Sequence, residues 1–96
     1  MPDASTRNPY QHLREQIDRI DAELLRLLNE RAEAALEIGR LKRANGEAIH
    51  VPERERSVIE RAVRANRGPL DNGAVSALFE AIITHIRALE ERGTQH

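Results

Sequence analysis

One long stripe of apolar residues dominates the first half of the chain. Between residues 9 and 45 these residues recur at steps of three and four, which is the spacing of an amphipathic α-helix. The stripe comprises Leu13, Ile17, Ile20, Leu24, Leu27, Ala34, Ala35, Ile38 and Leu41. Asn8 and Pro9 are typical of a helix start, and Gly46 is typical of the position just beyond a helix end. The pattern therefore predicts a helix of about 37 residues, roughly 55 Å long.

Two shorter helices follow in the predicted all-α fold. Val51 precedes a proline and should therefore be extended, and Pro52 should open the second helix. The apolar face of this helix comprises Val58, Ile59, Ala62 and Val63. Asp71 and Asn72 offer caps for a third helix that should end near Arg92. Its apolar stripe comprises Val75, Leu78, Phe79, Ile82, Ile86 and Leu89.

The length and the charge balance bound the function. We expect one domain at residues 9–92, with disordered termini at residues 1–8 and 93–96. The sequence has 15 Lys and Arg against 16 Asp and Glu, and its aromatic residues are Tyr10 and Phe79. Nucleic-acid binding calls for a basic excess or for aromatic platforms, so we expect no nucleic-acid partner.

The residue types also exclude several kinds of site. The chain has no cysteine, which excludes disulfides, thiolate catalysis and zinc–thiolate centres. His12, His50, His85 and His96 do not have the spacing of metal ligands. We therefore expect no metal and no cofactor. Because no apolar run approaches the roughly 18 residues of a membrane span and no signal peptide opens the chain, we expect a soluble, cytoplasmic protein.

The long helix also predicts self-association. A compact chain of 96 residues is on the order of 30 Å across, which is much shorter than the first helix. A core built from so few apolar residues is also marginal by itself. We therefore expect a homodimer in which a second copy covers the rest of the long helix.

Charged residues interrupt the apolar faces and leave alternatives open. Arg31 and Lys42 are eleven residues apart on the first helix and face within roughly 20° of each other. A buried cation is costly without a partner, so each either pairs with a carboxylate or points into a cavity that receives an anion. Glu55 either pairs with a core cation or accepts a hydrogen bond from a bound hydroxyl. Gly39 either permits a close helix crossing or leaves room for a ligand. On its pattern alone, Glu90 is predicted to be a solvated charge.

Four blocks of sequence, in this order and spacing, resemble a known family. They are LREQIDRIDAELLRLLNERAEAALEIGRLK, PERERSVIERA, GPLDN and LFEAIITHIRALE. The resemblance covers residues 13–92 and is to the all-helical (AroQ-class) chorismate mutases. Within this class the chain is most similar to the mutase domains of bifunctional chorismate mutase/prephenate dehydratases and of mutase-fused DAHP synthases.

The resemblance implies a reaction and an assembly. Members convert chorismate to prephenate by a unimolecular Claisen rearrangement in the shikimate pathway, towards phenylalanine and tyrosine. They form intertwined homodimers of three-helix chains, in which the long helix of one chain completes the site of the other. Arg14 matches the crossing position. It lies about 100° around the helix from Arg31, so a partner's copy of Arg14 suits the site better than the copy in the same chain.

The resemblance also implies roles for individual residues. The implied substrate-binding set is Arg14, Arg31, Lys42, Arg54, Glu55, Ile86 and Glu90, and Arg31, Lys42 and Glu90 are its catalytic members. Arg14 of one chain and Arg31 of the other would hold the carboxylates of the substrate. Lys42 would contact the ether oxygen and a carboxylate. Glu55 would accept from the ring hydroxyl, and Arg54 would support the charge network.

Glu90 would meet the ether oxygen from the side opposite Lys42. Because only a protonated carboxyl donates a hydrogen bond, Glu90 should act in its neutral form. Two positions depart from the family. Val51 stands where some members carry an acid that binds the hydroxyl, and Ile86 stands where many carry a small or polar residue near a carboxylate.

Two other functions remain open on the sequence. The same fold supports isochorismate pyruvate-lyase activity for salicylate synthesis. Alternatively, the chain is a weakly active regulatory or docking module for a shikimate-pathway partner enzyme.

Overall fold

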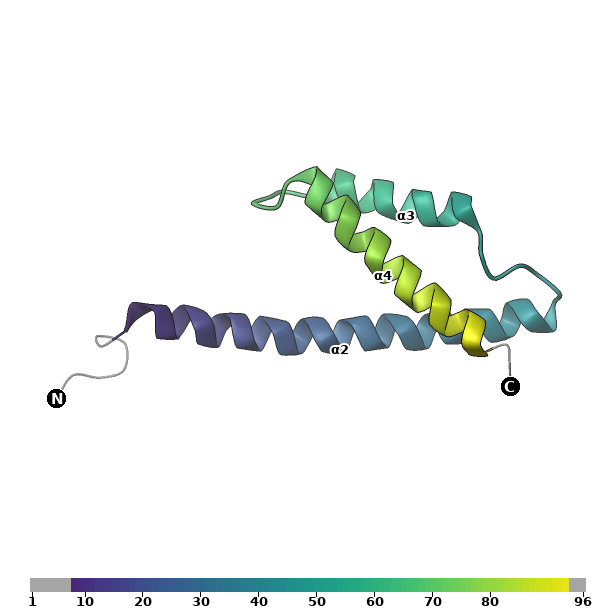
Figure 1. The fold of residues 1–96 in the computed structure, drawn as a ribbon, viewed down its shortest axis with the longest axis horizontal. Helices are drawn as coiled ribbons and strands as arrows, with labels where there is room; N and C mark the ends of the chain where they lie inside the picture. The colour runs from purple at the N-terminus through teal and green to yellow at the C-terminus, as the bar shows by residue number, and fades with distance from the viewer. Residues whose placement is uncertain (1–7, 94–96) are drawn as a thin grey trace. The chain divides into compact units, whose positions relative to one another are not determined.

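The structure, a computed structural model, describes residues 8–93 and contains three α-helices in that range (Figure 1). They are α2 (Pro9–Ala44), α3 (Pro52–Ala65) and α4 (Asn72–Gly93). The all-α prediction is confirmed, with element bounds within one or two residues of those expected. The tails predicted to be disordered lie outside the described residues, apart from Asn8 and Gly93, and Gly93 belongs to α4.

Local capping explains both ends of α2. At its start, the Asn8 side-chain oxygen accepts a hydrogen bond from the Tyr10 N–H at 3.0 Å. At its end, Gly46 adopts φ 70°, a left-handed conformation that glycine tolerates. This allows the Glu47 N–H to donate to the Lys42 carbonyl at 2.7 Å and the Gly46 N–H to donate to the Arg43 carbonyl at 3.2 Å. These two bonds form a Schellman motif, which ends the helix where the sequence predicts.

The starts of α3 and α4 also follow their sequence signals. Val51 is extended, with φ −123° and ψ 92°, and Pro52 takes the first helical position. At the start of α4, the Asp71 carboxylate accepts a hydrogen bond from the Ala74 N–H at 2.7 Å. The turn before it contains a cis peptide bond between Gly68 and Pro69.

The described chain divides into two units within α2. The N-terminal segment, residues 8–31, is the first part of this helix, and the C-terminal unit, residues 32–93, contains its remainder together with α3 and α4. In the C-terminal unit α3 packs against α4 (Figure 1). The most buried side chains of this unit are those of Val75, Ile83 and Ile86, all on α4. The half-buried face of α3 includes Val58, Ile59, Ala62 and Val63, as predicted.

The buried face of α4 is turned relative to the predicted stripe. Ile83, which the stripe omitted, is only 7% exposed, whereas Leu78, which it included, is 53% exposed. Ile83 lies about 80° from Val75 around the helix and Leu78 lies about 60° away on the other side. Packing against α3 therefore buries the Ile83 side of α4 and leaves the Leu78 side exposed.

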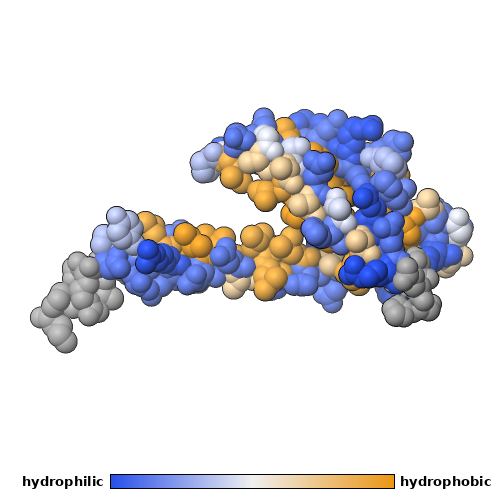
Figure 2. Space-filling model, in the orientation of Figure 1, coloured by the Kyte–Doolittle hydropathy of each residue, from blue (hydrophilic) through white to orange (hydrophobic). Residues whose placement is uncertain are grey.

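The face of α2 that packs within the C-terminal unit also differs from the predicted stripe. Gly39 is the buried residue of α2, while Ile38 and Leu41 are 50% and 57% exposed. Along the N-terminal segment, Leu13, Ile17, Ile20, Leu24 and Leu27 are likewise exposed. Figure 2 shows hydrophobic side chains at the surface over α2. This chain alone therefore does not bury the stripe. Among the described residues, no helix is long and apolar enough to cross a membrane.

Candidate active site

Lys42 reaches from α2 to the connection between α2 and α3. Its Nζ donates a hydrogen bond to the Ile49 carbonyl at 3.4 Å, and the residue is half-buried. The Schellman motif positions this contact, because it reverses the chain immediately after α2 and brings residue 49 back toward Lys42. The ammonium group is thus held at the C-terminal end of α2, where the helix dipole favours a cation.

Glu55 joins α3 to α4 through Arg87. The Arg87 Nη1 donates to both carboxylate oxygens of Glu55, at 2.7 and 2.9 Å. The two side chains are 23% and 24% exposed, so the pair is partly shielded from solvent. The Nε2 of His50, in the connection before α3, lies 3.4 Å from the same carboxylate. The alternative in which Glu55 pairs with a cation of the fold is therefore realised in this structure.

Gly39 and Glu90 bring α2 and α4 into close approach. A Cβ atom at Gly39 would lie 3.4 Å from the Glu90 carboxylate and 3.7 Å from the Glu90 Cβ. The Nη1 of Arg43, one turn along α2, donates to the Glu90 backbone carbonyl at 3.5 Å. The close-crossing interpretation of Gly39 is thus supported. The Glu90 carboxylate lies against α2 in the helix crossing, so the prediction from its pattern alone, a solvated charge, is corrected.

These contacts, together with short steps along the chain, connect residues of all three helices. Gly39 and Lys42 are one turn apart on α2, and Lys42 bonds the carbonyl next to His50. His50 lies near the Glu55 carboxylate, and Glu55 pairs with Arg87. Arg87 is one turn before Glu90 on α4, and the Glu90 side chain lies beside Gly39. We call this set the circuit: Gly39, Lys42, His50, Glu55, Arg87 and Glu90. It contains one amine, one imidazole, one guanidinium and two carboxylates.

Other predicted site residues lie outside the circuit. Arg54 is exposed on α3, and Ile86 belongs to the apolar core of the C-terminal unit. Arg14 and Arg31 belong to the N-terminal segment. There Arg14 is exposed, with its guanidinium carbon 6.0 Å from the centroid of the Tyr10 ring, and Arg31 is half-buried.

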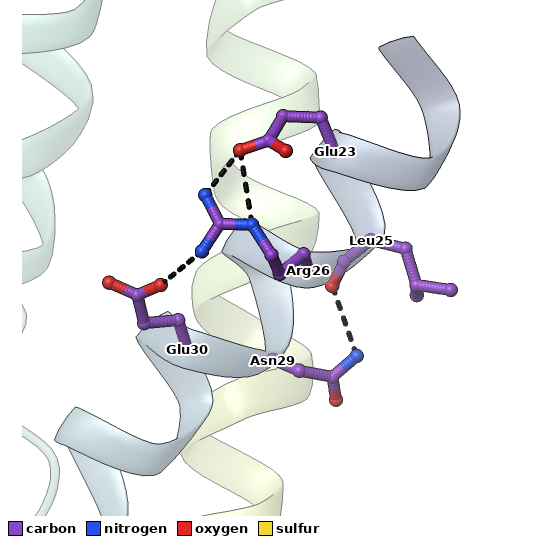
Figure 3. Close-up of polar contacts among 5 residues, drawn as sticks. All are labelled: Glu23, Leu25, Arg26, Asn29 and Glu30. Atoms are coloured by element: carbon purple, nitrogen blue, oxygen red, sulfur yellow. Dashed lines mark hydrogen bonds and ion pairs between the residues drawn. The ribbon is translucent and has the colours of Figure 1, made fainter. Parts of the chain in front are cut away.

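The N-terminal segment carries its own polar network (Figure 3). Arg26 donates to Glu23 and, at 2.8 Å, to Glu30, and the Asn29 side chain donates to the Leu25 carbonyl at 3.0 Å. Glu23, aided by Glu30, raises the pKa of the Arg26 guanidinium above its ordinary value. All three charged side chains are more than half exposed, which is typical of a solvated helix face.

Sequence reasoning missed Arg87 as a site residue. Its position beside the apolar stripe of α4 was the available signal, since a cation there needs a carboxylate nearby. The pattern predicted that Glu55 could pair with a cation but did not identify which one. Among residues 8–93, no group of three or more His, Asp or Glu side chains is arranged to hold a metal ion.

Comparison with known proteins identifies the family. The family model described as chorismate mutase type II matches residues 13–91. A bifunctional chorismate mutase/prephenate dehydratase from Aquifex aeolicus is 44% identical over 84 residues, covering 83% of this chain and 23% of that protein. The corresponding protein from Neisseria gonorrhoeae is 47% identical over 77 residues, covering 80% and 21%. The chain thus spans less than a quarter of the length of these curated relatives.

Solved structures agree with the sequence relatives. A chorismate mutase from Thermus thermophilus (form II) superposes with a TM-score of 0.87 at 36% identity, covering 88% of this chain and 97% of that one. A chorismate mutase from Helicobacter pylori in complex with prephenate gives a TM-score of 0.82 at 26% identity, covering 91% and 94%. Together with the match over residues 13–91, these likenesses show that the chain belongs to the type II chorismate mutase family.

Proposed function

We propose that the chain is a chorismate mutase that converts chorismate to prephenate as a homodimer. The observation that carries the proposal is the circuit, in a chain of this family. It includes Lys42 of α2, Glu55 of α3 and Glu90 of α4, three of the residues that the family resemblance assigns to the substrate.

The rearrangement is unimolecular, so the protein must orient one molecule and stabilise charge. The ether C–O bond breaks while a C–C bond forms between the enolpyruvyl arm and the ring. No proton transfer and no cofactor is needed. We assign Arg14 of one chain and Arg31 of the other to the two carboxylates of the substrate, because the planar guanidinium binds a carboxylate through two hydrogen bonds. Holding the flexible arm over the ring removes much of the entropic cost of reaction.

Negative charge grows on the ether oxygen as the bond breaks. Lys42 supplies a positive donor for this oxygen, and its hydrogen bond to Ile49 keeps the amine near its working position beforehand. Glu90 serves as the second donor in its protonated form. The absence of a side chain at Gly39 leaves room for the Glu90 carboxyl beside α2.

The ring hydroxyl and the charge network involve α3. Glu55 accepts a hydrogen bond from the hydroxyl, and Arg54 contributes positive potential from the first turn of the same helix. Ile86, buried in the core of the C-terminal unit, contributes by packing rather than by a polar contact.

A second copy is the proposed occupant of the exposed apolar stripe of α2. The stripe runs along a helix roughly 54 Å long, and its apolar residues are about half exposed in the single chain. Because full burial of an exposed Leu or Ile yields about 1.5–3 kcal/mol, burying the remaining half yields about 0.8–1.5 kcal/mol each, which favours association. The same pairing would deliver Arg14 to the partner's site. We further propose a cytoplasmic location, and we retain activation by a shikimate-pathway partner enzyme as an alternative for the test below.

The test is an assay of the purified protein with chorismate. We expect chorismate absorbance to fall as prephenate forms. In a separate assay with isochorismate, we expect no release of pyruvate. Pyruvate release would instead support the lyase hypothesis. Turnover only after addition of cell extract would support the docking-module hypothesis. The relatives reported above bear chorismate mutase names, so neither alternative is favoured.

A further inference from the structure

We propose that Arg87 is a positioning residue that holds the Glu55 carboxylate in the orientation in which it accepts the ring hydroxyl of the substrate. The inference rests on the proposed mutase function and adds a residue that the predicted site did not contain. It follows from the geometry of the Glu55–Arg87 pair and from its contrast with the ion pairs of α2.

The pair fixes the position of the carboxylate through contacts to both of its oxygens. One nitrogen of Arg87 lies almost equally far from both oxygens of Glu55, at 2.7 and 2.9 Å. The partners are 32 residues apart in sequence and come from different helices. The position of the carboxylate is therefore set by the packing of α3 on α4, which also includes the buried neighbour Ile86.

The ion pairs of α2 have a different character. Arg26 pairs with Glu23 and Glu30, and Arg40 pairs with Glu37, at spacings of three or four residues within one helix. Their side chains are more than half exposed, and exposed pairs of this kind contribute little. The Glu55–Arg87 pair is less than half as exposed and joins two elements, so it can hold a side chain in place for function.

The clamped carboxylate retains capacity to accept a hydrogen bond. An ionised carboxylate has two oxygens with about four acceptor sites in total. Arg87 uses one site on each oxygen, and His50 approaches Oε1 at 3.4 Å. Oε2 therefore has a further site for a hydroxyl, and the substrate need not displace Arg87 to bind.

The hydroxyl does not react, so its contact should be equally strong in the ground state and in the transition state. Loss of such a contact raises KM and leaves kcat nearly unchanged. A freed Glu55 side chain would have to be ordered again each time substrate binds, which weakens binding in the same way. This pattern separates Arg87 from Lys42, whose loss should lower kcat.

The experiment uses the full chain and compares Arg87→Met with Arg87→Lys. We expect Arg87→Met to raise KM for chorismate about tenfold with kcat changed less than threefold, and Arg87→Lys to recover most of the loss. Calorimetry with prephenate, which retains the ring hydroxyl, should show a matching loss of affinity. Arg61→Met is the matched control, because Arg61 is an exposed arginine on α3 with no assigned role.

A double-mutant cycle tests whether Arg87 acts through Glu55. In a Glu55→Gln background, Arg87→Met should change KM less than twofold. An equal rise in KM in both backgrounds would overturn the proposal, as would a loss of thermal stability with unchanged KM. If Arg87→Met does not fold, a wild-type KM in Arg87→Gln would overturn it equally. A wild-type protein without mutase activity would instead refute the proposed function, and the role of Arg87 with it.

Discussion

The two units of this chain differ in the range of their polar contacts and in the exposure of their apolar residues. In the N-terminal segment, residues 8–31, the polar contacts are local, such as those of Arg26 with Glu23 and Glu30 (Figure 3), and the apolar residues are exposed. In the C-terminal unit, residues 32–93, contacts such as Glu55–Arg87 join residues far apart in sequence. The first unit thus leaves its apolar face exposed within this chain, whereas the second joins helices through contacts between distant residues.

This difference indicates where each part of the proposed function resides. The groups that we propose for the breaking bond and for the hydroxyl belong to the C-terminal unit, where helix packing can preorganise them. Arg14, assigned to a substrate carboxylate, sits on the unit whose apolar face is exposed within this chain. We therefore expect substitutions on the apolar face of the N-terminal segment to impair dimerisation and activity together. Substitutions at the assigned residues of the C-terminal unit should impair activity without changing dimerisation.

The largest expected effect comes from breaking the exposed apolar face of the N-terminal segment. Ile20→Asp would place a charge in each copy of the proposed interface, and an unpaired buried charge is costly. We expect a monomer by analytical ultracentrifugation and a loss of activity of at least about 1,000-fold, or roughly 4.1 kcal/mol. Arg19→Asp, which adds the same residue on the neighbouring exposed position, is the control and should remain dimeric. A dimeric, active Ile20→Asp protein would refute the proposed interface.

The second largest expected effect is a loss of kcat on substitution of Lys42 in the C-terminal unit, with the dimer unchanged. Lys42→Ala should lower kcat by on the order of 3 kcal/mol of transition-state stabilisation, because it removes the donor for the ether oxygen. The dimer should still fold, as judged by circular dichroism and sedimentation. If the variant unfolds while its folded fraction turns over normally, Lys42 is a structural residue rather than a catalytic one.

Mixing two variants tests whether residues of two different chains form one site. Arg14→Ala and Arg31→Ala should each lose most activity as homodimers. After the two are mixed and refolded, about half of the dimers should be heterodimers, each with one intact site and one doubly damaged site. We therefore expect about a quarter of wild-type activity per dimer on average, measured as initial rates. Recovery near zero would argue against shared sites.

Much of the fold was predictable because its signals are local. Asn8 and Gly46 set the bounds of α2, and Pro52 and Asp71 set the starts of α3 and α4. Which face of each helix is buried was less predictable, because it depends on the packing partner. Much of the stripe of α2 was expected to be covered by a second copy, but the sequence did not indicate that Gly39 rather than Ile38 or Leu41 would be the residue buried within this chain.

Residues of the candidate site could be predicted only where their position on one helix or the family resemblance singled them out. Lys42 and Glu55 were singled out by their inward positions and by the family resemblance, and Glu90 by the resemblance alone. Arg87 was missed because the register of α3 against α4 determines its pairing, and helical periodicity within one element does not contain that information. The roles of Lys42, Glu55 and Glu90, like those of Arg14 and Arg31, rest on the resemblance and are the subject of the experiments.

The smallest expected effect concerns Glu90 and appears in the pH dependence. The developing charge on the ether oxygen needs a hydrogen-bond donor, and a carboxyl group donates only when it is protonated. Activity should therefore be highest on the acid side. Above the titration of Glu90 in the site, kcat/KM should fall by up to about tenfold per pH unit. Glu90→Gln donates at every pH because an amide does not titrate, so its profile should be flat over the same range.

The measurement is kcat/KM against pH for wild type, Glu90→Gln and a matched control, Glu91→Gln. Glu91 is exposed and adjacent on α4, so its variant should keep the wild-type profile. The amide of Glu90→Gln has nearly the same size as the carboxyl, so its fit beside Gly39 is preserved. Identical profiles for wild type and Glu90→Gln would show that Glu90 does not donate to the reacting oxygen. The Gly39–Glu90 approach would then be a helix-packing feature, and Lys42 would be the remaining assigned donor to the ether oxygen.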